Sequence, residues 1–235
     1  MAHVVKYHPS ISLLEQYSEG TLAPELCLIV AAHLDFCPHC QTLHRDIEAD
    51  LGCELAMQKA PVVDGSQWEQ MLDQILSAEP VAREELSKQH SLHSADNKSG
   101  RVSELLVGAH RFTVPRSLQR IVAKRNKWLT LGGIATAKLP GSEENHLSLL
   151  CIETDTEVPL HTHKGLEVTL VLAGEMVDEM GHYAAGDLII NTPDHTHTPK
   201  NISAEPCLCL SVLTAPLEFK QGLTRLLNPL QRFFY

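Results

Sequence analysis

The order of apolar and polar residues divides the 235-residue chain into a helical part and a later part built of strands. Between about residues 10 and 78, apolar side chains recur every three or four positions, which places them on one face of a helix. From residue 128 onward, short apolar runs with a period of two are separated by Gly, Pro, Asn and Asp. The pattern predicts a two-domain α + β protein, with a small helical domain first and an all-β domain second.

The amino-terminal part is expected to contain about four helices. Ser10 can cap the first helix, and Gly20 ends it. Pro24 and Pro38 suit the first turns of the second and third helices, because proline has no N–H to leave unpaired there. We expect the helices between residues 10 and 20, from 25 to about 36, from 38 to before 61, and from about 66 to 78. A helical domain of this size has little core and is expected to need a metal to fold.

The later part is predicted to form a barrel or sandwich, because it contains many short strands at regular spacing. Strands are expected at residues 128–131, 147–154, 167–172, 174–178, 187–190 and 207–213. The amphipathic tail, residues 216–235, is expected to form a short helix that packs on this domain. Residues 79 to about 104 contain few apolar side chains and are typical of a linker. We therefore expect domains at residues 1–80 and 105–235, joined by a linker at 81–104.

The negative charge of the chain is concentrated in its helical part. The whole chain has a formal net charge of -10. Residues 1–80 contain twelve Asp and Glu against three Lys and Arg, and the remainder is nearly balanced. An acidic domain repels phosphate, so direct binding to DNA is not expected. A partner with a basic surface, such as a DNA-binding protein, would suit it, although acidic residues are also typical of ordinary solvated helix faces.

Seven cysteines, without a signal peptide or an apolar run of transmembrane length, predict a protein of the reducing cytoplasm with no membrane span. Their odd number fits metal ligands better than a set of disulfides. Five of them are expected to be buried apolar residues: Cys27, Cys53, Cys151, Cys207 and Cys209. Cys207 and Cys209 face the same side of one predicted strand, but neighbours two apart rarely reach the geometry of a disulfide.

Three metal-ligand residues fall within eight positions, in the pattern H-x3-C-x2-C at His33, Cys37 and Cys40. Residues four apart share a helix face, so His33 and Cys37 point the same way, and Pro38 begins a new helix. The two cysteines then flank the amino end of that helix, where free N–H groups and the helix dipole favour thiolates. Two thiolates and an imidazole supply three ligands of a tetrahedral zinc site. His8, in a turn-like segment ahead of the first helix, is the expected fourth ligand.

The other histidines of this part are weaker candidates. His3 lies in a segment that is expected to fray. His39 and His44 are typical of solvated helix residues, and His90 and His93 of the linker are expected to bind no metal. A thioredoxin-like redox pair needs a preceding strand in a βαβ unit, and a c-type haem site needs a histidine directly after the second cysteine. The chain has neither feature.

A second ligand cluster lies in the β-rich part, at His161, His163 and Glu167. Alternate residues of a strand face the same side, so both histidines can point into a barrel, and Glu167 begins the next strand. Together with the run from residue 186 to 197, this pattern resembles the cupin family. The first cupin motif, H-x-H-x3-E-x6-G, is matched by His161, His163, Glu167 and Gly174, and the second by Gly186, His197 and Asn201. The resemblance implies that His161, His163, Glu167 and His197 bind one divalent metal in a barrel pocket, which is also a candidate site for a small ligand.

The chain departs from the cupin pattern in several places. Asp155 stands where the family has a glycine ahead of His161, Pro193 is displaced by one residue, and the gap between the motifs is short. His195 replaces a glycine and is a rival to His197 as the fourth ligand. Both histidines face the same side of a strand, so only the register decides between them. Three imidazoles and a carboxylate suit Zn, Fe, Mn or Ni about equally, so the ligands do not name the metal.

The combination of the two halves resembles the ChrR-type zinc-binding anti-sigma factors. The similarity covers nearly the whole chain, from Tyr7-His8-Pro9-Ser10 through residues 32–40 to Ala215-Pro216-Leu217. It implies that His8, His33, Cys37 and Cys40 bind a structural zinc. It also implies that the helical domain wraps a sigma factor of the extracytoplasmic-function type and blocks its access to RNA polymerase and promoter. The cupin domain would be needed for release of that sigma factor under singlet oxygen or organic peroxide.

Two functions are therefore weighed. The first is a negative regulator of transcription and not an enzyme, with exposed apolar residues as anchors and acidic residues that speed association. Trp68 and Met71 of the fourth helix are typical of core or partner-groove residues. The alternative is a metal-dependent, dioxygenase-like cupin enzyme with a regulatory zinc domain. For such an enzyme, Glu153, Glu175 and Asp178 are the acidic residues that could face the cavity.

Overall fold

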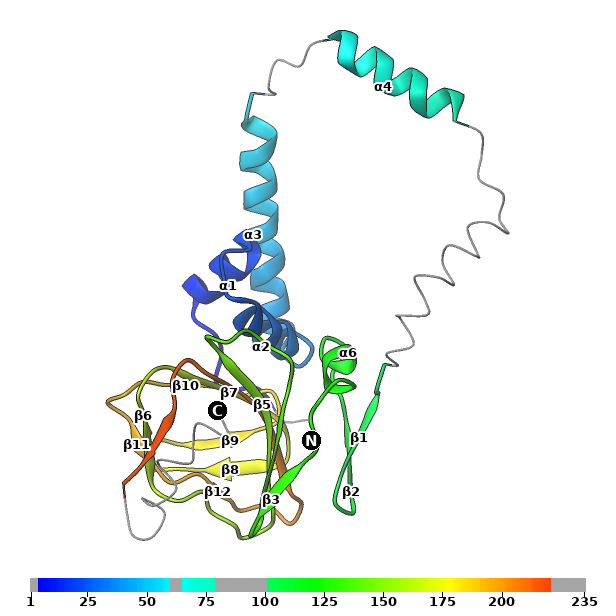
Figure 1. The fold of residues 1–235 in the computed structure, drawn as a ribbon. Coiled ribbons are helices and arrows are strands. Elements are labelled where there is room, and N and C mark those ends of the chain that lie inside the picture. Colours follow the sequence, from blue (N-terminus) through cyan, green and yellow to red (C-terminus); the bar gives the residue numbers. More distant parts are fainter. Residues whose placement is uncertain (1–3, 60–64, 79–100, 221–235) are drawn as a thin grey trace. The chain divides into compact units, whose positions relative to one another are not determined.

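The computed structural model describes residues 4–59, 65–78 and 101–220 (Figure 1). Residues 1–47 form one compact unit with residues 101–235, and residues 48–100 form a second unit. The predicted domains 1–80 and 105–235 with a linker at 81–104 stay a prediction, because residues 79–100 lie outside the described part. Among the described residues, no helix combines the length and the apolar character needed to cross a bilayer.

Four helices lie close to their predicted positions: α1 (Ile11–Glu19), α2 (Pro24–Leu34), α3 (Pro38–Met57) and α4 (Gly65–Ser77). The Oγ of Ser10 accepts the backbone N–H of Leu13 at 3.2 Å and so caps α1. Gly20 ends this helix in the left-handed conformation, with φ of 72°. Pro24 and Pro38 are the first residues of α2 and α3, as predicted.

Helix α2 contributes to two different cores. Val30 and Leu34 pack with Leu14 of α1 in a small helical core. Ile29 and Ala32 belong instead to the large core of the β-rich part. A helix that is apolar on several sides is buried on several sides, and α2 therefore helps to join the amino-terminal helices to the strands.

The β-rich part has a six-stranded sheet in the order β10-β7-β13-β5-β4-β3 and two three-stranded sheets, β11-β6-β14 and β12-β8-β9. All of its strand pairs are antiparallel, and this arrangement confirms the expected cupin-type fold. A hairpin, β1-β2, and the short helix α6 (Gln119–Val122) precede it. The strands are β1 (Glu104–Val107), β2 (His110–Thr113), β3 (Leu129–Leu131), β4 (Ile134–Lys138), β5 (His146–Ile152), β6 (His161–His163), β7 (Glu167–Ala173), β8 (Glu175–Val177), β9 (His182–Ala184), β10 (Leu188–Asn191), β11 (Thr196–His197), β12 (Lys200–Asn201), β13 (Cys207–Leu213) and β14 (Leu217–Phe219).

Central strand β13 shows how the large sheet separates two cores. Leu208 and Leu210 face the core that α2 shares. Cys207 and Cys209, one position away, face a second core between the sheets. Side chains alternate along a strand, so one face of the sheet supports the amino-terminal helices and the other lines the barrel interior.

The structure corrects three expectations. The start of the predicted tail helix is a strand, because β14 pairs with β6 through Leu217 opposite His163 and Phe219 opposite His161. Residues 221–235 lie outside the described part. Cys53 is exposed and not buried, and Cys27 is only half-buried. Cys53 lies on the later turns of α3, where the described residues are largely exposed.

Helix α4 belongs to the second compact unit. None of its residues is buried, although it carries apolar side chains at the spacing of one helix face. These are Trp68, Met71, Leu72, Ile75 and Leu76, each at least 44% exposed. Of the two roles predicted for Trp68 and Met71, the exposure fits contact with a partner better than a place in the core.

Candidate metal centres

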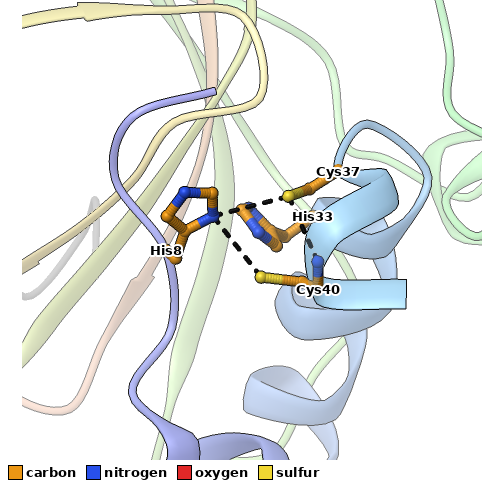
Figure 2. Close-up of side chains that lie close together, drawn as sticks. All are labelled: His8, His33, Cys37 and Cys40. Carbon is orange, nitrogen blue, oxygen red and sulfur yellow. Dashed lines mark hydrogen bonds between the residues drawn. The ribbon is translucent and has the colours of Figure 1, made fainter. Parts of the chain in front are cut away.

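The first candidate metal centre lies where α2 and α3 meet the segment before α1 (Figure 2). His33 is in the last turn of α2, Cys37 is in the corner before Pro38, and Cys40 is in the first turn of α3. His8 approaches from the amino-terminal segment, and its Nδ1 lies 3.4 Å from the Sγ atoms of both cysteines. One ligand atom from each of the four residues lies within 4.8 Å of the others. In a tetrahedral zinc site, ligand atoms lie roughly 3.3 to 3.8 Å apart, so the four side chains are close to that arrangement.

The surroundings of His33 fit a metal ligand. Its Nδ1 donates to the carbonyl oxygen of Gly186 at 2.8 Å, which leaves Nε2 unprotonated. This Nε2 is buried and has no hydrogen-bond partner among the described residues. Burial lowers the pKa of His33 to about 4, so the ring is neutral near pH 7. A neutral imidazole, fixed by a carbonyl and with a free buried nitrogen, is typical of a histidine that binds a metal.

The two cysteines explain why zinc suits this cluster. Cys37 and Cys40 are buried, and the N–H of Cys40 donates to the Sγ of Cys37 at 3.4 Å. Burial and the neighbouring Cys37 thiol raise the pKa of Cys40 to about 12. Without a bound cation, burial therefore keeps Cys40 in the thiol form, although the amino end of α3 favours the thiolate. A bound zinc ion displaces the thiol protons, because thiolate is the form that coordinates it.

The second candidate metal centre lies in the barrel, at His161 and His163 of β6, Glu167 at the start of β7, and His197 of β11. The Nε2 of His197 lies 3.1 Å from the Nε2 atoms of both His161 and His163. The Nε2 of His163 is also 3.1 Å from a carboxylate oxygen of Glu167. All three histidines are buried. Three ring nitrogens and a carboxylate that meet at one point form a donor set for one divalent cation.

Hydrogen bonds on the far side of these rings support the same interpretation. The Nδ1 of His161 donates to the carbonyl oxygen of Pro159, and that of His197 donates to the Oδ2 of Asp178, both at 2.9 Å. Both Nε2 atoms therefore present lone pairs to the cluster. Burial lowers the pKa of His161 to about 4, and it lowers the pKa of His163 as well. His161 and His163 are thus neutral near pH 7 and able to bind a metal.

Glu167 is held in its ionised form. Burial acts to raise the pKa of Glu167, but the nearby His163 and His161 outweigh this and lower it. The amide of Asn191 donates to its Oε2 at 3.0 Å, and the hydroxyl of Ser211 donates to its Oε1 at 3.3 Å. A carboxylate oriented in this way needs a positive partner inside the barrel, and a divalent cation would supply it.

The comparisons with known proteins cover both parts of the chain. Residues 120–216 match a family profile described as "ChrR Cupin-like domain". The chain is 33% identical to the anti-sigma-E factor ChrR of Cereibacter sphaeroides over 231 residues, which are 97% of this chain and 99% of that protein. The chain belongs to the ChrR family of anti-sigma factors. The crystal structure of Rhodobacter sphaeroides SigE in complex with the anti-sigma ChrR is also similar, with a TM-score of 0.65 and 29% identity. That match covers 89% of this chain and 99% of the chain in the complex.

In this ChrR-family chain, the register of the sheet places the rival histidines differently. His197 is opposite His161 in the pairing of β11 with β6, and its ring enters the cluster. His195 precedes the strand, and its Nδ1 accepts the backbone N–H of Thr192 at 3.1 Å. The geometry thus favours His197, the predicted fourth ligand, over His195.

Asp155 explains how the chain tolerates the missing cupin glycine. It is the one non-glycine residue with positive φ in the described part of the chain, with φ of 55°. Aspartate is among the residues that enter this left-handed conformation at modest cost. The chain therefore keeps the positive-φ conformation at this position although it has aspartate instead of glycine.

The other histidines that were considered as metal ligands do not join either cluster. His39 is exposed, and its ring only approaches the edge of the His8 ring, with centroids 5.4 Å apart. The Nδ1 of His44 forms a hydrogen bond with the hydroxyl of Ser18 at 2.9 Å. His3, His90 and His93 lie outside the described residues.

The acidic residues considered for an enzyme have separate roles. Glu175 pairs with His182 at 2.9 Å on the exposed side of the β8-β9 hairpin, and Glu153 lies 3.5 Å from His110. Asp178 bonds to the far side of a cluster histidine. The sequence did not predict three contacts around these centres: Gly186 accepts from His33, Tyr183 donates to Asp178, and Tyr7 packs on Tyr183. Each joins residues that carry no local pattern pointing to the other.

The three buried cysteines of the β-rich part are as predicted. Cys151, Cys207 and Cys209 are each at most 1% exposed. The Sγ atoms of Cys207 and Cys209 lie 3.7 Å apart, which is a contact between thiols and not a covalent bond. These residues fill the cores on the two faces of the large sheet.

Proposed function

We propose that this chain is an anti-sigma factor that binds an extracytoplasmic-function sigma factor as a heterodimer and blocks its access to RNA polymerase and promoter. The observation that carries the proposal is the 33% identity to the anti-sigma-E factor ChrR over nearly the full length of both proteins. The similarity to ChrR in complex with SigE supports a sigma factor as the partner. The two ligand clusters are the parts of the chain that give this role a physical basis.

The helical part supplies the binding surface in this proposal. Helix α4 presents Trp68, Met71 and Ile75 as exposed apolar side chains. Large side chains of this kind are typical anchors in a groove of a partner. The excess of acidic residues in residues 1–80 speeds association with a basic DNA-binding protein and sets the orientation of the complex.

Zinc in the first cluster would act as a structural crosslink, held by His8, His33, Cys37 and Cys40. These residues join the amino-terminal segment to the corner between α2 and α3. Zinc with four protein ligands leaves no open position for a substrate, as expected of a structural site. His161, His163, Glu167 and His197 would hold zinc or another divalent metal in the barrel, where a small ligand could also bind.

We place the response to stress in the cupin part. In this proposal, singlet oxygen or an organic peroxide leads to release of the sigma factor, and the cupin part is required for that release. The protein acts in the cytoplasm, where its partner meets RNA polymerase, without binding DNA or a membrane itself.

Co-purification with sigma factors tests the proposal. The chain is expressed with the extracytoplasmic-function sigma factors of its source, and the captured complex is weighed by native mass spectrometry. A one-to-one complex is expected for the unchanged chain and for Cys53→Ser, which alters an exposed cysteine outside the cluster. Cys37→Ser is expected to lose the complex. If the metal-loaded chain captures no sigma factor, or if Cys37→Ser binds as well as the unchanged chain, the proposal is wrong.

The second candidate is a metal-dependent cupin enzyme, which the buried His161, His163, Glu167 and His197 set favours. Four protein ligands of this kind leave further positions of a six-coordinate metal free for oxygen or substrate. Oxygen consumption by the iron- or manganese-loaded chain with small oxygenated substrates would support it. No turnover above that of a Glu167→Gln variant would contradict it.

A further inference from the structure

We propose that the two metal centres are coupled, so that occupation of the barrel centre changes how tightly the helical centre holds its metal, through the contact His197–Asp178–Tyr183–Tyr7. The coupling would give the cupin part a physical means of acting on the sigma-binding part. This biological role rests on the proposed function. Asp178, Tyr183 and Tyr7 are positioning residues in this arrangement, since they act on ligands and are not ligands themselves.

The first step leads from the barrel centre to strand β9. The Oδ2 of Asp178 accepts a hydrogen bond from His197, and its Oδ1 accepts the hydroxyl of Tyr183 at 3.0 Å. The backbone N–H groups of Met180 and Gly181 also donate to Oδ1. The Asp178 side chain is 2% exposed, so it has little room to adjust. A change in the position of the His197 ring would therefore reach the Tyr183 hydroxyl through the Asp178 carboxylate.

The second step leads from β9 to the helical centre. The ring of Tyr183 packs against the ring of Tyr7, with centroids 4.8 Å apart. Tyr7 directly precedes the predicted zinc ligand His8. The backbone of this segment is fixed as well, because Tyr7 accepts from the N–H of Leu188 at 3.0 Å and donates to the Oδ1 of Asp187 at 3.0 Å. The position of His8 thus depends on the same part of the barrel that holds Asp178.

The turn between β9 and β10 makes a second connection to the same centre. Gly186 in this turn accepts the hydrogen bond from His33. It has φ of 97°, and a Cβ at this position would lie 2.7 Å from Val5 and 3.0 Å from Phe36. Glycine is required here both for the backbone shape and for the close approach of the amino-terminal part. Two of the four helical ligands, His8 and His33, are therefore tied to the β9-β10 turn and its neighbours.

These two connections lead from the barrel to His8 and His33 of the helical centre. A continuous series of contacts, each either packed or hydrogen-bonded, can carry a coupling free energy between two sites. Linkage is reciprocal, so loss of metal from either centre changes the affinity of the other by the same factor. Couplings of this kind are typically about five- to 150-fold.

The test uses the full chain loaded with cobalt(II) in place of zinc, without a sigma factor. Thiolate-to-cobalt charge transfer reports the helical centre alone, because the ligands of the barrel centre contain no sulfur. A competing chelator is titrated to equilibrium, at a strength that leaves the barrel centre of the unchanged chain occupied, and the loss of this band gives the dissociation constant of cobalt at the helical centre. This constant is compared for the unchanged chain and for Glu167→Gln, which disables the barrel centre, and we expect the two values to differ roughly fivefold or more. Equal dissociation constants would overturn the proposal.

The route is tested in the background of Tyr183→Phe, which lacks the hydroxyl that Asp178 accepts. There the effect of Glu167→Gln is expected to shrink to less than about twofold, since a double-mutant cycle isolates the coupling. His182→Gln is the matched control on the same strand and should keep the full effect, because the His182 side chain pairs with the exposed Glu175 and lies outside the proposed route. An effect that persists unchanged in Tyr183→Phe would contradict the route.

Should Tyr183→Phe fail to fold, Tyr7→Leu removes the ring on the other side of the contact and keeps the backbone hydrogen bonds of this segment. The same loss of coupling is expected from it, and full coupling would overturn the route. Because no sigma factor is present, the result is independent of whether the chain proves to be an anti-sigma factor. A chain that shows the coupling but captures no sigma factor would refute the proposed function alone.

Discussion

The two metal centres differ in how the chain assembles them. Three of the candidate ligands of the helical centre, His33, Cys37 and Cys40, lie within eight residues at the junction of two helices. The candidate ligands of the barrel centre come from three strands, and the position of the last one, His197, depends on the pairing of β11 with β6. Sulfur ligands in a closed set favour zinc and a structural role, whereas histidines with a carboxylate accept several metals and leave positions open. The helical cluster can therefore be recognised from the spacing of residues in the sequence, whereas the barrel cluster is completed only by the pairing of strands.

The largest effect is expected from removing a thiolate from the helical centre. Cys40→Ser should weaken zinc binding there by a factor of about 1,000 or more, since structural zinc binding in small domains contributes about 10 to 16 kcal/mol. Zinc retained after dialysis against a chelator, measured by elemental mass spectrometry in a Glu167→Gln background that disables the barrel centre, checks this. Cys53→Ser is the control and should retain its zinc. Retention of helical zinc in Cys40→Ser would show that Cys40 is not a ligand.

A smaller effect is expected from the residue behind the barrel centre. Asp178→Asn replaces the carboxylate that orients His197 and should lower the metal affinity of the barrel centre about 10- to 100-fold. Isothermal titration of the metal-free protein with manganese or zinc measures it. Glu175→Gln, on the neighbouring strand β8 with an exposed partner, should leave the affinity unchanged. An equal loss in both variants would point to general damage to the hairpin and not to Asp178.

The connection between the helices and the barrel can be weakened without touching either centre. Glu25, in the first turn of α2, is buried and accepts the N–H of Ser142 and the amide of Asn145. Burial acts to raise the pKa of Glu25, but these hydrogen bonds outweigh it and hold the pKa below the ordinary 4.5. Glu25→Gln should therefore lower the free energy of unfolding by about 1 to 2 kcal/mol near pH 7.

The sign of the pH dependence follows from the lowered pKa of Glu25. The carboxylate stabilises the fold fully above pH 4.5 and loses this contribution as the pH falls through its lower folded value. The difference between Glu25→Gln and the unchanged chain should shrink accordingly in acid, as measured by urea unfolding at several pH values. Glu15→Gln, at an exposed position of α1, is the control and should have no such effect. A difference that does not depend on pH would contradict the role given to the Glu25 carboxylate.

The smallest effect, on the free energy of unfolding, is expected from a change of Asp155, which stands where cupins have a glycine. Asp155→Gly should raise the free energy of unfolding by about 0.5 kcal/mol, because glycine enters the positive-φ conformation more easily but loses more chain entropy. Thermal unfolding of the metal-loaded protein measures the change, and the metal content of both centres should stay the same. A clear loss of stability would show that the Asp155 side chain stabilises its turn by another contact.

Local features of the sequence determined the helical centre and most element positions. The intervals between His33, Cys37 and Cys40 lie within two helical turns, and the caps at Ser10 and Gly20 act on their own helix. Such signals depend on neighbours a few residues away, so they are legible without the fold. The cupin pattern likewise predicted which residues line the barrel, because strand alternation is also local.

Only the tertiary structure decided what depends on distant segments. The choice between His197 and His195 needed the register with β6, and the strand at residues 217–219 needed an open edge to pair with. The contacts of Tyr7 with Tyr183 and of His33 with Gly186 join residues more than 150 positions apart. Such pairings form when the packing of the whole chain outweighs the entropy lost in closing a long loop. A short stretch of sequence does not reveal this balance.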